Sequence, residues 1–267
     1  MRNIDRRKWL KTVGLSSSFA LLGGFEALAI NPKHLPNNAE ILARLNANEN
    51  PYGPSPRVRK VISDNIDLGC RYPFRTLSSL VEMIADKEGV TKDHVVVTGG
   101  STEGLKAAGL TFGGFGEGEI IAADPTFQAM LNYAETFGTK IHRVPVNDKM
   151  EHDLEAMANK INPKTKLIFI CNPNNPTGNL LDKNKLKDFC ETHDSQTIIF
   201  SDEAYYDFIT EPDYPSMVEL VKNGRNIIVS KTFSKVYGLA GLRVGYLIAR
   251  PDIATKLKAS VMANTNT

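Results

Sequence analysis

The segment from Ser230 to Arg243 combines residue types that can do covalent chemistry. It contains Lys235, the hydroxyl residues Thr232 and Ser234 just before it, and Arg243 eight residues after it. Such an amine can form a Schiff base with an aldehyde cofactor, while hydroxyls and a guanidinium can hold the phosphate of that cofactor. We therefore expect a phosphorylated, aldehyde-bearing ligand at Lys235.

A second amine in the same segment, that of Lys231, competes for this role. The position of Arg243 relative to Lys235 favours Lys235, and Lys231 is expected to face solvent. The alternative for the whole segment is a strand followed by a basic surface loop.

Two other turns carry functional groups directly after apolar runs. Gly100, Ser101 and Thr102 open a helical stretch, where glycine lets a phosphate approach the backbone and free N–H groups can bind it. Asp202 ends an apolar run, and a buried carboxylate is costly without a cationic partner. Each feature alone has a plainer explanation, because glycine, serine and aspartate also commonly cap helices.

The elements that must position these residues alternate between strands and helices. Strands are predicted at 94–98, 119–123, 140–146, 166–171, 197–201, 226–230 and 244–249, and several of these are nearly continuous apolar runs, which indicates burial on both faces. Helical spacing of apolar residues is found at 56–67, 76–88, 102–111, 126–137, 153–160 and 182–193. This alternation predicts an α/β fold with a largely parallel sheet, in which ligands bind beyond the carboxyl ends of the strands. The connection 235–243 is too short for a helical crossover, so the last strand is expected to be antiparallel.

Five motifs in a fixed order make the chain similar to a known family. The turn Asn172–Gly178, with the sequence Asn-Pro-Asn-Asn-Pro-Thr-Gly, is the most specific of them. Together with 98–104, 124–127, 201–205 and the Lys235 segment, it resembles the class I/II aminotransferases, especially their histidinol-phosphate aminotransferase branch. The resemblance implies pyridoxal 5'-phosphate as cofactor. It also implies the aspartate aminotransferase-like large domain, with a mainly parallel seven-stranded sheet and helices on both faces.

The resemblance further implies roles for individual residues. Lys235 would carry the Schiff base and act as general base, and Asp202 would pair with the pyridine nitrogen. Asn175 and Tyr205 would bind the phenolic oxygen of the cofactor, with Tyr205 also tuning the catalytic imine. The other implied cofactor-binding residues are Gly100, Ser101, Thr102, Phe127, Thr232, Ser234 and Arg243.

Two further elements match the family less specifically. Tyr72 would reach the cofactor phosphate of a neighbouring subunit, which implies a homodimer. Tyr52 and Gly53 would face the substrate. The alternatives are a tyrosine packed beside a turn at position 72 and, for Phe127, a core phenylalanine.

The implied function is that of a pyridoxal-phosphate-dependent aminotransferase. An amino acid or a histidinol-phosphate-like amine would give its amino group to a 2-oxo acid such as 2-oxoglutarate. A decarboxylase or carbon–sulfur lyase with the same cofactor is one alternative. The chain ends before most of the family's small domain and its carboxylate-binding arginine, so a truncated, non-catalytic cofactor-binding fragment is another.

Residues 1–29 resemble a twin-arginine (Tat) signal peptide. Arg6 and Arg7 precede an uncharged stretch that ends in the small-x-small sequence Ala27-Leu28-Ala29. The uncharged stretch is short for a stable membrane span. We therefore expect export by the Tat machinery to a bacterial periplasm; the alternatives are a membrane anchor or a disordered basic tail. Residues 30–70 would form an arm and a piece of the small domain, and residues 71–267 the cofactor-binding large domain.

The composition narrows the remaining possibilities. With 267 residues, 42% of them hydrophobic, the chain can bury a sizeable core. A net charge of +2 gives no indication of a nucleic-acid partner. The sequence shows no metal-binding motif, and Cys70, Cys171 and Cys190 match no zinc or redox spacing, so we expect them to be buried thiols.

Overall fold

The structure is a computed structural model that describes residues 45–262. The predicted signal peptide (1–29) and residues 30–44 of the predicted arm and small-domain piece lie outside the described residues. The chain divides into two units, Met1–Ala47 and Asn48–Thr267, and the description below concerns the second unit.

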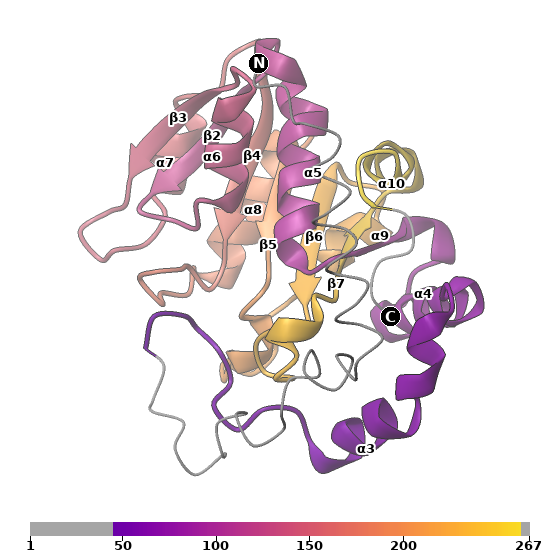
Figure 1. Ribbon diagram of the computed structural model, residues 1–267. Coiled ribbons are helices and arrows are strands. Elements are labelled where there is room, and N and C mark those ends of the chain that lie inside the picture. The colour runs from indigo at the N-terminus through magenta and orange to yellow at the C-terminus, as the bar shows by residue number, and fades with distance from the viewer. Residues whose placement is uncertain (1–44, 263–267) are drawn as a thin grey trace, which may run out of the picture. The chain divides into compact units, whose positions relative to one another are not determined.

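A seven-stranded sheet with the order β1-β7-β6-β5-β4-β2-β3 forms the centre of this unit (Figure 1). Its strands are β1 (Val95–Thr98), β2 (Glu119–Asp124), β3 (Lys140–Pro145), β4 (Thr165–Cys171), β5 (Ile198–Asp202), β6 (Ile227–Thr232) and β7 (Gly245–Ala249). Neighbouring strands are parallel except that β7 runs antiparallel to both β1 and β6. The predicted strands are therefore confirmed to within two residues at each end, and so is the direction of the last one.

Helices cover both faces of the sheet (Figure 1). The helices that pack on one face are α5 (Ser101–Gly113), α6 (Ala129–Thr136) and α10 (Pro251–Lys258). Those on the other face are α4 (Phe74–Glu88), α7 (Leu154–Ala158), α8 (Lys183–His193) and α9 (Val218–Lys222). The five-residue helix α9 was not predicted. Single 3-10 turns are η3 (Ile66–Cys70), η4 (Lys92–His94), η5 (Gly114–Gly116), η6 (Tyr206–Phe208) and η7 (Ala240–Leu242).

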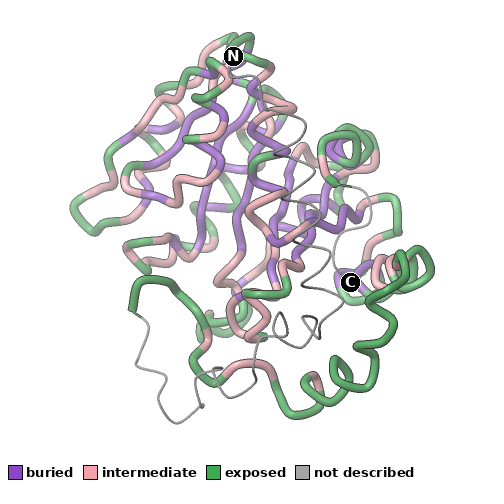
Figure 2. The backbone as a smooth tube through the Cα atoms, in the orientation of Figure 1, coloured by how far each residue is buried: buried purple, intermediate pink, exposed green. Residues whose placement is uncertain are grey.

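Except for the edge strand β3, the strands are buried on both sides, which explains their nearly continuous apolar sequences (Figure 2). Successive residues of a strand point to opposite faces. In β5, Ile199 belongs to the layer with α4, and Phe200 to the layer with α5. Two separate apolar layers thus fix the register of the central strands, and with it the places of the polar residues at their ends.

The segment before α4 is much less covered. Helix α3 (Pro56–Asp64) has no buried residue, and large apolar side chains beside it are exposed. Cys70, in η3, is exposed as well, so the prediction of a buried thiol was wrong there, while Cys171 and Cys190 are buried. Among the described residues, no helix is long and apolar enough to cross a membrane.

Candidate active site

The carboxyl ends of β1 and β6 meet the start of β7 at one edge of the sheet. Register pairs Thr98 of β1 with Gly245 of β7, and Gly245 in turn with Thr232 of β6. A Cβ on Gly245 would come within 2.7 Å of the Ser101 nitrogen, so only glycine lets β7 pass this close to the start of α5.

The turn between β1 and α5 and the side chain of Arg243 form a cradle of positive character. Gly100 has φ of 79°, and a Cβ there would come within 2.9 Å of Arg243 Cζ. Arg243 is held by a hydrogen bond from Nη1 to Ala240 O of 2.8 Å. No side chain among the described residues caps α5, so its first N–H groups, including those of Ser101 and Thr102, point beyond the helix end. This combination binds phosphate groups well.

Space for a ligand adjoins this cradle. A cavity of about 360 Å³ runs along α5 from Gly99, Thr102 and Arg243 and is also lined by Tyr133, Ser260 and Met262; Lys235 and Asp202 are not among its lining residues. In the lysine segment, the hydroxyl of Thr232 donates to Ser234 Oγ at 3.0 Å, and both residues are buried. Because Ser234 Oγ accepts that bond, its own hydrogen remains available to another acceptor.

Lys235 follows β6 in the same segment and is half-buried. Its Nζ donates to Asn48 O at 2.8 Å and is 5.4 Å from the centre of the Tyr205 ring. Burial lowers the pKa of Lys235, and Arg243 lowers it further, while Asp202 and Glu49 oppose that shift. A lowered pKa raises the fraction of neutral amine, which is the nucleophilic form.

The predicted partners Asn175 and Tyr205 are brought together. Tyr205 Oη accepts from Asn175 Nδ2 at 3.5 Å and from Asn48 Nδ2 at 3.0 Å. Burial raises the pKa of Tyr205, so its phenol remains a hydrogen-bond donor at neutral pH. Phe127 is partly buried against the apolar layer with α5.

The loop 48–53 is tied closely to the lysine segment. Asn50 Nδ2 donates to Val236 O at 2.9 Å, and a Cβ on Gly238 would come within 2.7 Å of Pro54 N. Gly53 has φ of 65°, and Tyr52 is 87% exposed. Asn48 contacts both Lys235 and Tyr205 and is a site residue that the sequence reasoning missed. The Asn- and Pro-rich composition of this loop signals a turn but does not identify its partners.

Asp202 is a buried carboxylate that forms no ion pair with any described residue. It is 2% exposed, and its Oδ1 accepts from Ala204 N at 3.2 Å. Burial raises the pKa of Asp202 to about 7, an effect to which neighbouring Glu203 adds and which Lys235 opposes. A cationic group at this carboxylate would restore its ionised form.

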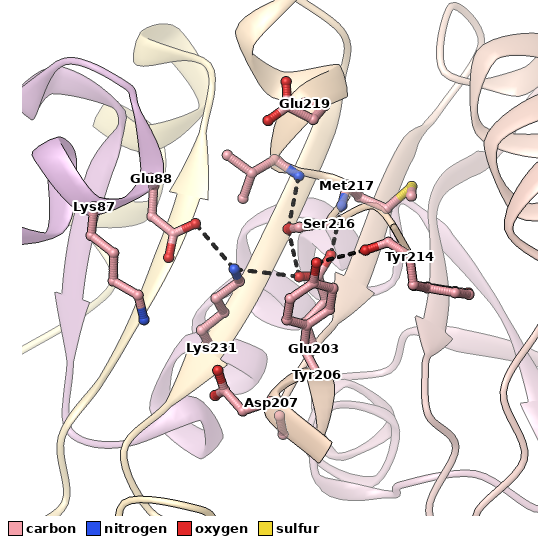
Figure 3. A network of polar contacts seen from close by, with 12 residues as sticks. Lys87, Glu88, Glu203, Tyr206, Asp207, Tyr214, Ser216, Met217, Glu219 and Lys231 are labelled. Carbon is pink, nitrogen blue, oxygen red and sulfur yellow. Dashed lines mark hydrogen bonds and ion pairs between the residues drawn. The ribbon is translucent and has the colours of Figure 1, made fainter. Parts of the chain in front are cut away.

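Lys231 is not solvated, contrary to the sequence-based expectation (Figure 3). Its side chain is only 12% exposed, and its Nζ lies 3.0 Å from Glu88 Oε2 and 3.6 Å from Glu203 Oε2. Burial alone would lower the pKa of Lys231, but the two carboxylates raise it. The Lys231 ammonium is therefore held in ion pairs with Glu88 and Glu203, which leaves Lys235 as the available amine of the segment.

Further hydrogen bonds complete this network. Tyr246 Oη donates to Glu88 Oε1 at 2.7 Å, and Ser216 Oγ donates to Glu203 Oε2 at 2.7 Å. The network joins the end of α4 to β6 and to the residue that follows β5 (Figure 3). Through Tyr246 it also reaches β7.

Tyr72 is not brought to this site. It is 78% exposed and contacts Phe74, with 5.9 Å between the ring centres. Its predicted role across a subunit interface stays a prediction. No group of three or more His, Cys, Asp or Glu that could hold a metal ion occurs in residues 45–262.

These observations define a class of site. One end is an anion cradle made by Gly100, the start of α5 and Arg243. The other end is a buried carboxylate, Asp202, that lacks a cation, and a nucleophilic amine, Lys235, belongs to the same site. Such a site fits a ligand with a phosphate, a protonatable ring nitrogen and a carbonyl carbon.

The chain belongs to the class I and II aminotransferase family, whose sequence profile matches residues 40–265. It is 40% identical over 215 residues to the histidinol-phosphate aminotransferase of Moorella thermoacetica, covering 80% of this chain and 55% of the relative. It is 36% identical over 219 residues to the aromatic amino acid aminotransferase of Streptomyces avermitilis, covering 82% of this chain and 61% of the relative. The chain thus spans little more than half the length of these relatives.

Solved structures share the fold. A histidinol-phosphate aminotransferase from Sinorhizobium meliloti in complex with pyridoxal-5'-phosphate superposes with a TM-score of 0.72 at 24% identity, over 80% of this chain and 57% of that one. An aspartate aminotransferase from Thermotoga maritima gives a TM-score of 0.72 at 22% identity, over 99% of this chain and 72% of that one. The expected aspartate aminotransferase-like fold is therefore confirmed.

Proposed function

We propose that this chain binds pyridoxal 5'-phosphate and serves transamination. The observation that carries the proposal is the meeting of three complementary groups from separate elements: the Arg243 cradle, the Asp202 carboxylate and the Lys235 amine. Family membership supports the proposal, as does the complex formed by the Sinorhizobium meliloti enzyme.

Each part of the cofactor has a counterpart in the site. Gly100, Ser101, Thr102, Thr232, Ser234 and Arg243 would hold the phosphate. Asp202 would bind the pyridine nitrogen, Asn175 and Tyr205 the phenolic oxygen, and Phe127 one face of the ring. The pKa of Asp202, about 7 without a cation beside it, gives a physical reason for this pairing, since a protonated pyridine nitrogen would supply the missing charge.

Pyridoxal phosphate, when bound, supplies a carbonyl carbon that amines attack and a ring that withdraws electrons from a substrate carbon. Lys235 provides the amine, and burial favours its neutral form. In that form Nζ can also accept a proton from a substrate carbon and return it elsewhere. Asn48 orients Lys235 and Tyr205 toward each other through its carbonyl and its amide.

The proposed amino donor is an amino acid or a phosphorylated amino alcohol, and the proposed acceptor is a 2-oxo acid such as 2-oxoglutarate. The names of the two curated relatives support this choice, since one is a histidinol-phosphate aminotransferase and the other an aromatic amino acid aminotransferase.

A titration of the purified chain with pyridoxal phosphate tests the cofactor site. We expect a visible absorbance band to develop, and we expect reduction with borohydride to leave a phosphopyridoxyl group on the peptide that contains Lys235, that is, the cofactor's mass less the water lost and plus two hydrogens. The variant K235A should lose the covalent mass, whereas K187A, on the exposed side of α8, should keep it. Failure of the wild-type chain to acquire the mass at Lys235 would refute the assignment.

Product analysis then tests the reaction. With histidinol phosphate or an aromatic amino acid plus 2-oxoglutarate, we expect glutamate to form in step with the corresponding oxo product. Release of carbon dioxide or of a sulfur leaving group without glutamate would instead identify a decarboxylase or a carbon–sulfur lyase. Cofactor binding without any product would favour the reading of a non-catalytic fragment.

We further propose that the chain forms a homodimer. Support comes from large apolar side chains that are exposed together around η3 and the start of α4: Ile66, Leu68, Tyr72 and Phe74. Light scattering after size exclusion should give twice the chain mass, and a replacement of Leu68 by Asp should shift it toward the monomer. A monomeric wild-type chain at micromolar concentration would contradict this proposal.

Export to the periplasm by the Tat machinery is a separate proposal that rests on residues 1–29. The support is the Arg6-Arg7 pair followed by the uncharged stretch and the Ala27-Leu28-Ala29 sequence. Fractionation of expressing cells should find the protein in the periplasm. The variant R6K/R7K should retain it in the cytoplasm, and equal distribution of both forms would refute the signal.

A further inference from the structure

Two serine hydroxyls in the central sheet are buried without a hydrogen-bond partner among residues 45–262. They are Ser201 Oγ on β5 and Ser230 Oγ on β6, in residues that are 1% and 0% exposed. Buried hydroxyls are almost always hydrogen-bonded, so each such exception calls for an explanation. The two serines differ in what lies beside them.

Ser230 lies next to Asp202. In the parallel register of β5 and β6, the Cα atom of Asp202 is paired with that of Ser230. On its other side, Asp202 is paired with Cys171 of β4. Paired residues of neighbouring strands point to the same face, and such strands lie about 4.8 Å apart. Ser230 Oγ already lowers the pKa of Asp202, although it makes no hydrogen bond of normal geometry.

Ser201 points the other way. Because successive strand residues alternate between faces, the side chain of Ser201 is directed to the face opposite to that of Asp202. Its chemistry and burial nevertheless match those of Ser230. Ser201 is therefore a matched control for the loss of a buried, unpartnered hydroxyl.

Asp202 has one hydrogen bond and room for another. Its Oδ1 accepts from Ala204 N, and a carboxylate oxygen can accept more than one bond. The titratable groups that interact with Asp202 are Glu203, Lys235, Tyr205 and Cys171. Of these, Lys235 favours the ionised carboxylate and Glu203 disfavours it.

We propose that Ser230 is a positioning residue of the cofactor site, whose hydroxyl rotates to donate to the Asp202 carboxylate and keeps it ionised and oriented toward the pyridine nitrogen. The role toward the pyridine nitrogen rests on the proposed function. The contact between hydroxyl and carboxylate does not, because it can form in the chain without cofactor.

The first experiment measures the ionisation of Asp202 in the full chain without cofactor. Infrared difference spectra recorded across neutral pH follow the protonated carboxyl band that disappears in D202N. S230A removes a hydrogen bond to the ionised carboxylate, so it should raise the pH midpoint of Asp202 ionisation by about one unit. S230C, which keeps the side-chain size but is a weaker donor, should show a smaller rise, and S201A should match the wild type.

The second experiment titrates the same variants with pyridoxal phosphate at a pH between the two midpoints. The dissociation constant of S230A should rise by about two- to fivefold, since between two midpoints that differ by one pH unit the ionised fraction of Asp202 falls by about that factor. That of S201A should not change. The difference should fade at a pH well above both midpoints, which a general loss of packing would not produce.

Two results would overturn the proposal: an unchanged midpoint in S230A, or an equal shift in S230A and S201A. Failure of the wild-type chain to bind the cofactor would instead refute the proposed function, and the infrared midpoints would still decide whether Ser230 serves Asp202. Circular dichroism of S230A and S201A identifies any variant that fails to fold, and S230C then supplies the comparison.

Discussion

Replacement of Lys231 by Met should be among the most destabilising single changes in this chain. The substitution keeps much of the side-chain volume and removes the ammonium that two carboxylates share, with side-chain exposures of 7% for Glu88 and 4% for Glu203. Breaking a buried ion pair from one side costs about 3–5 kcal/mol, because the remaining charge is left without a partner. The free energy of unfolding in urea, followed by circular dichroism, measures this loss.

The pH dependence of this loss identifies its cause. Burial raises the pKa of Glu203, and without Lys231 that pKa should rise further. A carboxyl whose pKa is higher in the folded than in the unfolded state stabilises the fold below the unfolded value, and this contribution is lost as the pH rises through the folded value. K231M should therefore be closest to the wild type at mildly acidic pH and furthest from it above neutral pH.

Two variants serve as controls for K231M. K222M removes a lysine whose partner Glu219 is 63% exposed, and it should change the stability by no more than about 0.5 kcal/mol. The double variant K231M/E203Q removes a charge from both sides and should recover part of the loss. If K231M lowered the free energy of unfolding by less than about 1 kcal/mol, or by an amount independent of pH, the view that Lys231 neutralises two buried carboxylates would be refuted.

Three other changes probe the site itself. Gly100→Ala should greatly weaken cofactor binding in a folded chain, because φ of 79° and the Arg243 guanidinium both exclude a Cβ; a pyridoxal phosphate titration beside circular dichroism measures this. In the chain without cofactor, the pKa of Asp202 is about 7 in the folded state and about 4 in the unfolded state, so stability should fall as the pH rises between these values. Thermal melts should show this trend in the wild type and a flatter one in D202N. Asn48→Ala removes the amide that donates to Tyr205 and should weaken cofactor binding by about two- to tenfold, whereas unchanged affinity would contradict a role for Asn48.

Much of the sheet was predictable because its physical demands are local. A strand buried on both faces needs an uninterrupted apolar run, and each such run here became a strand. The short connection before Arg243 also fixed the direction of β7, since it cannot cross the sheet. Asp202 lies at the end of one predicted strand and Lys235 follows the next one. Because the carboxyl ends of parallel strands meet at the same edge of a sheet, the sequence alone predicts that these two residues lie near one another.

The contacts that complete the site depend on residues far apart in the sequence. Lys235 and its acceptor Asn48 are separated by 187 positions, and Lys231 and Glu88 by 143. No local pattern identifies such partners, so Lys231 looked like a surface lysine and Asn48 like a turn residue. A buried lysine becomes predictable only when the carboxylates that neutralise it are known.

The end of β5 shows why one buried carboxylate marks a binding site and its neighbour does not. Glu203 meets Lys231, Ser216 and a backbone N–H inside the fold, so its charge is compensated by the chain itself. Asp202 is as deeply buried but has a single backbone N–H as its hydrogen-bonded partner in the described part of the chain, and its pKa of about 7 reflects that shortage. A protein gains no stability from a carboxylate left in this state. The unmet charge of Asp202 is therefore best explained by a cationic ligand atom, which the ring nitrogen of the proposed cofactor would supply.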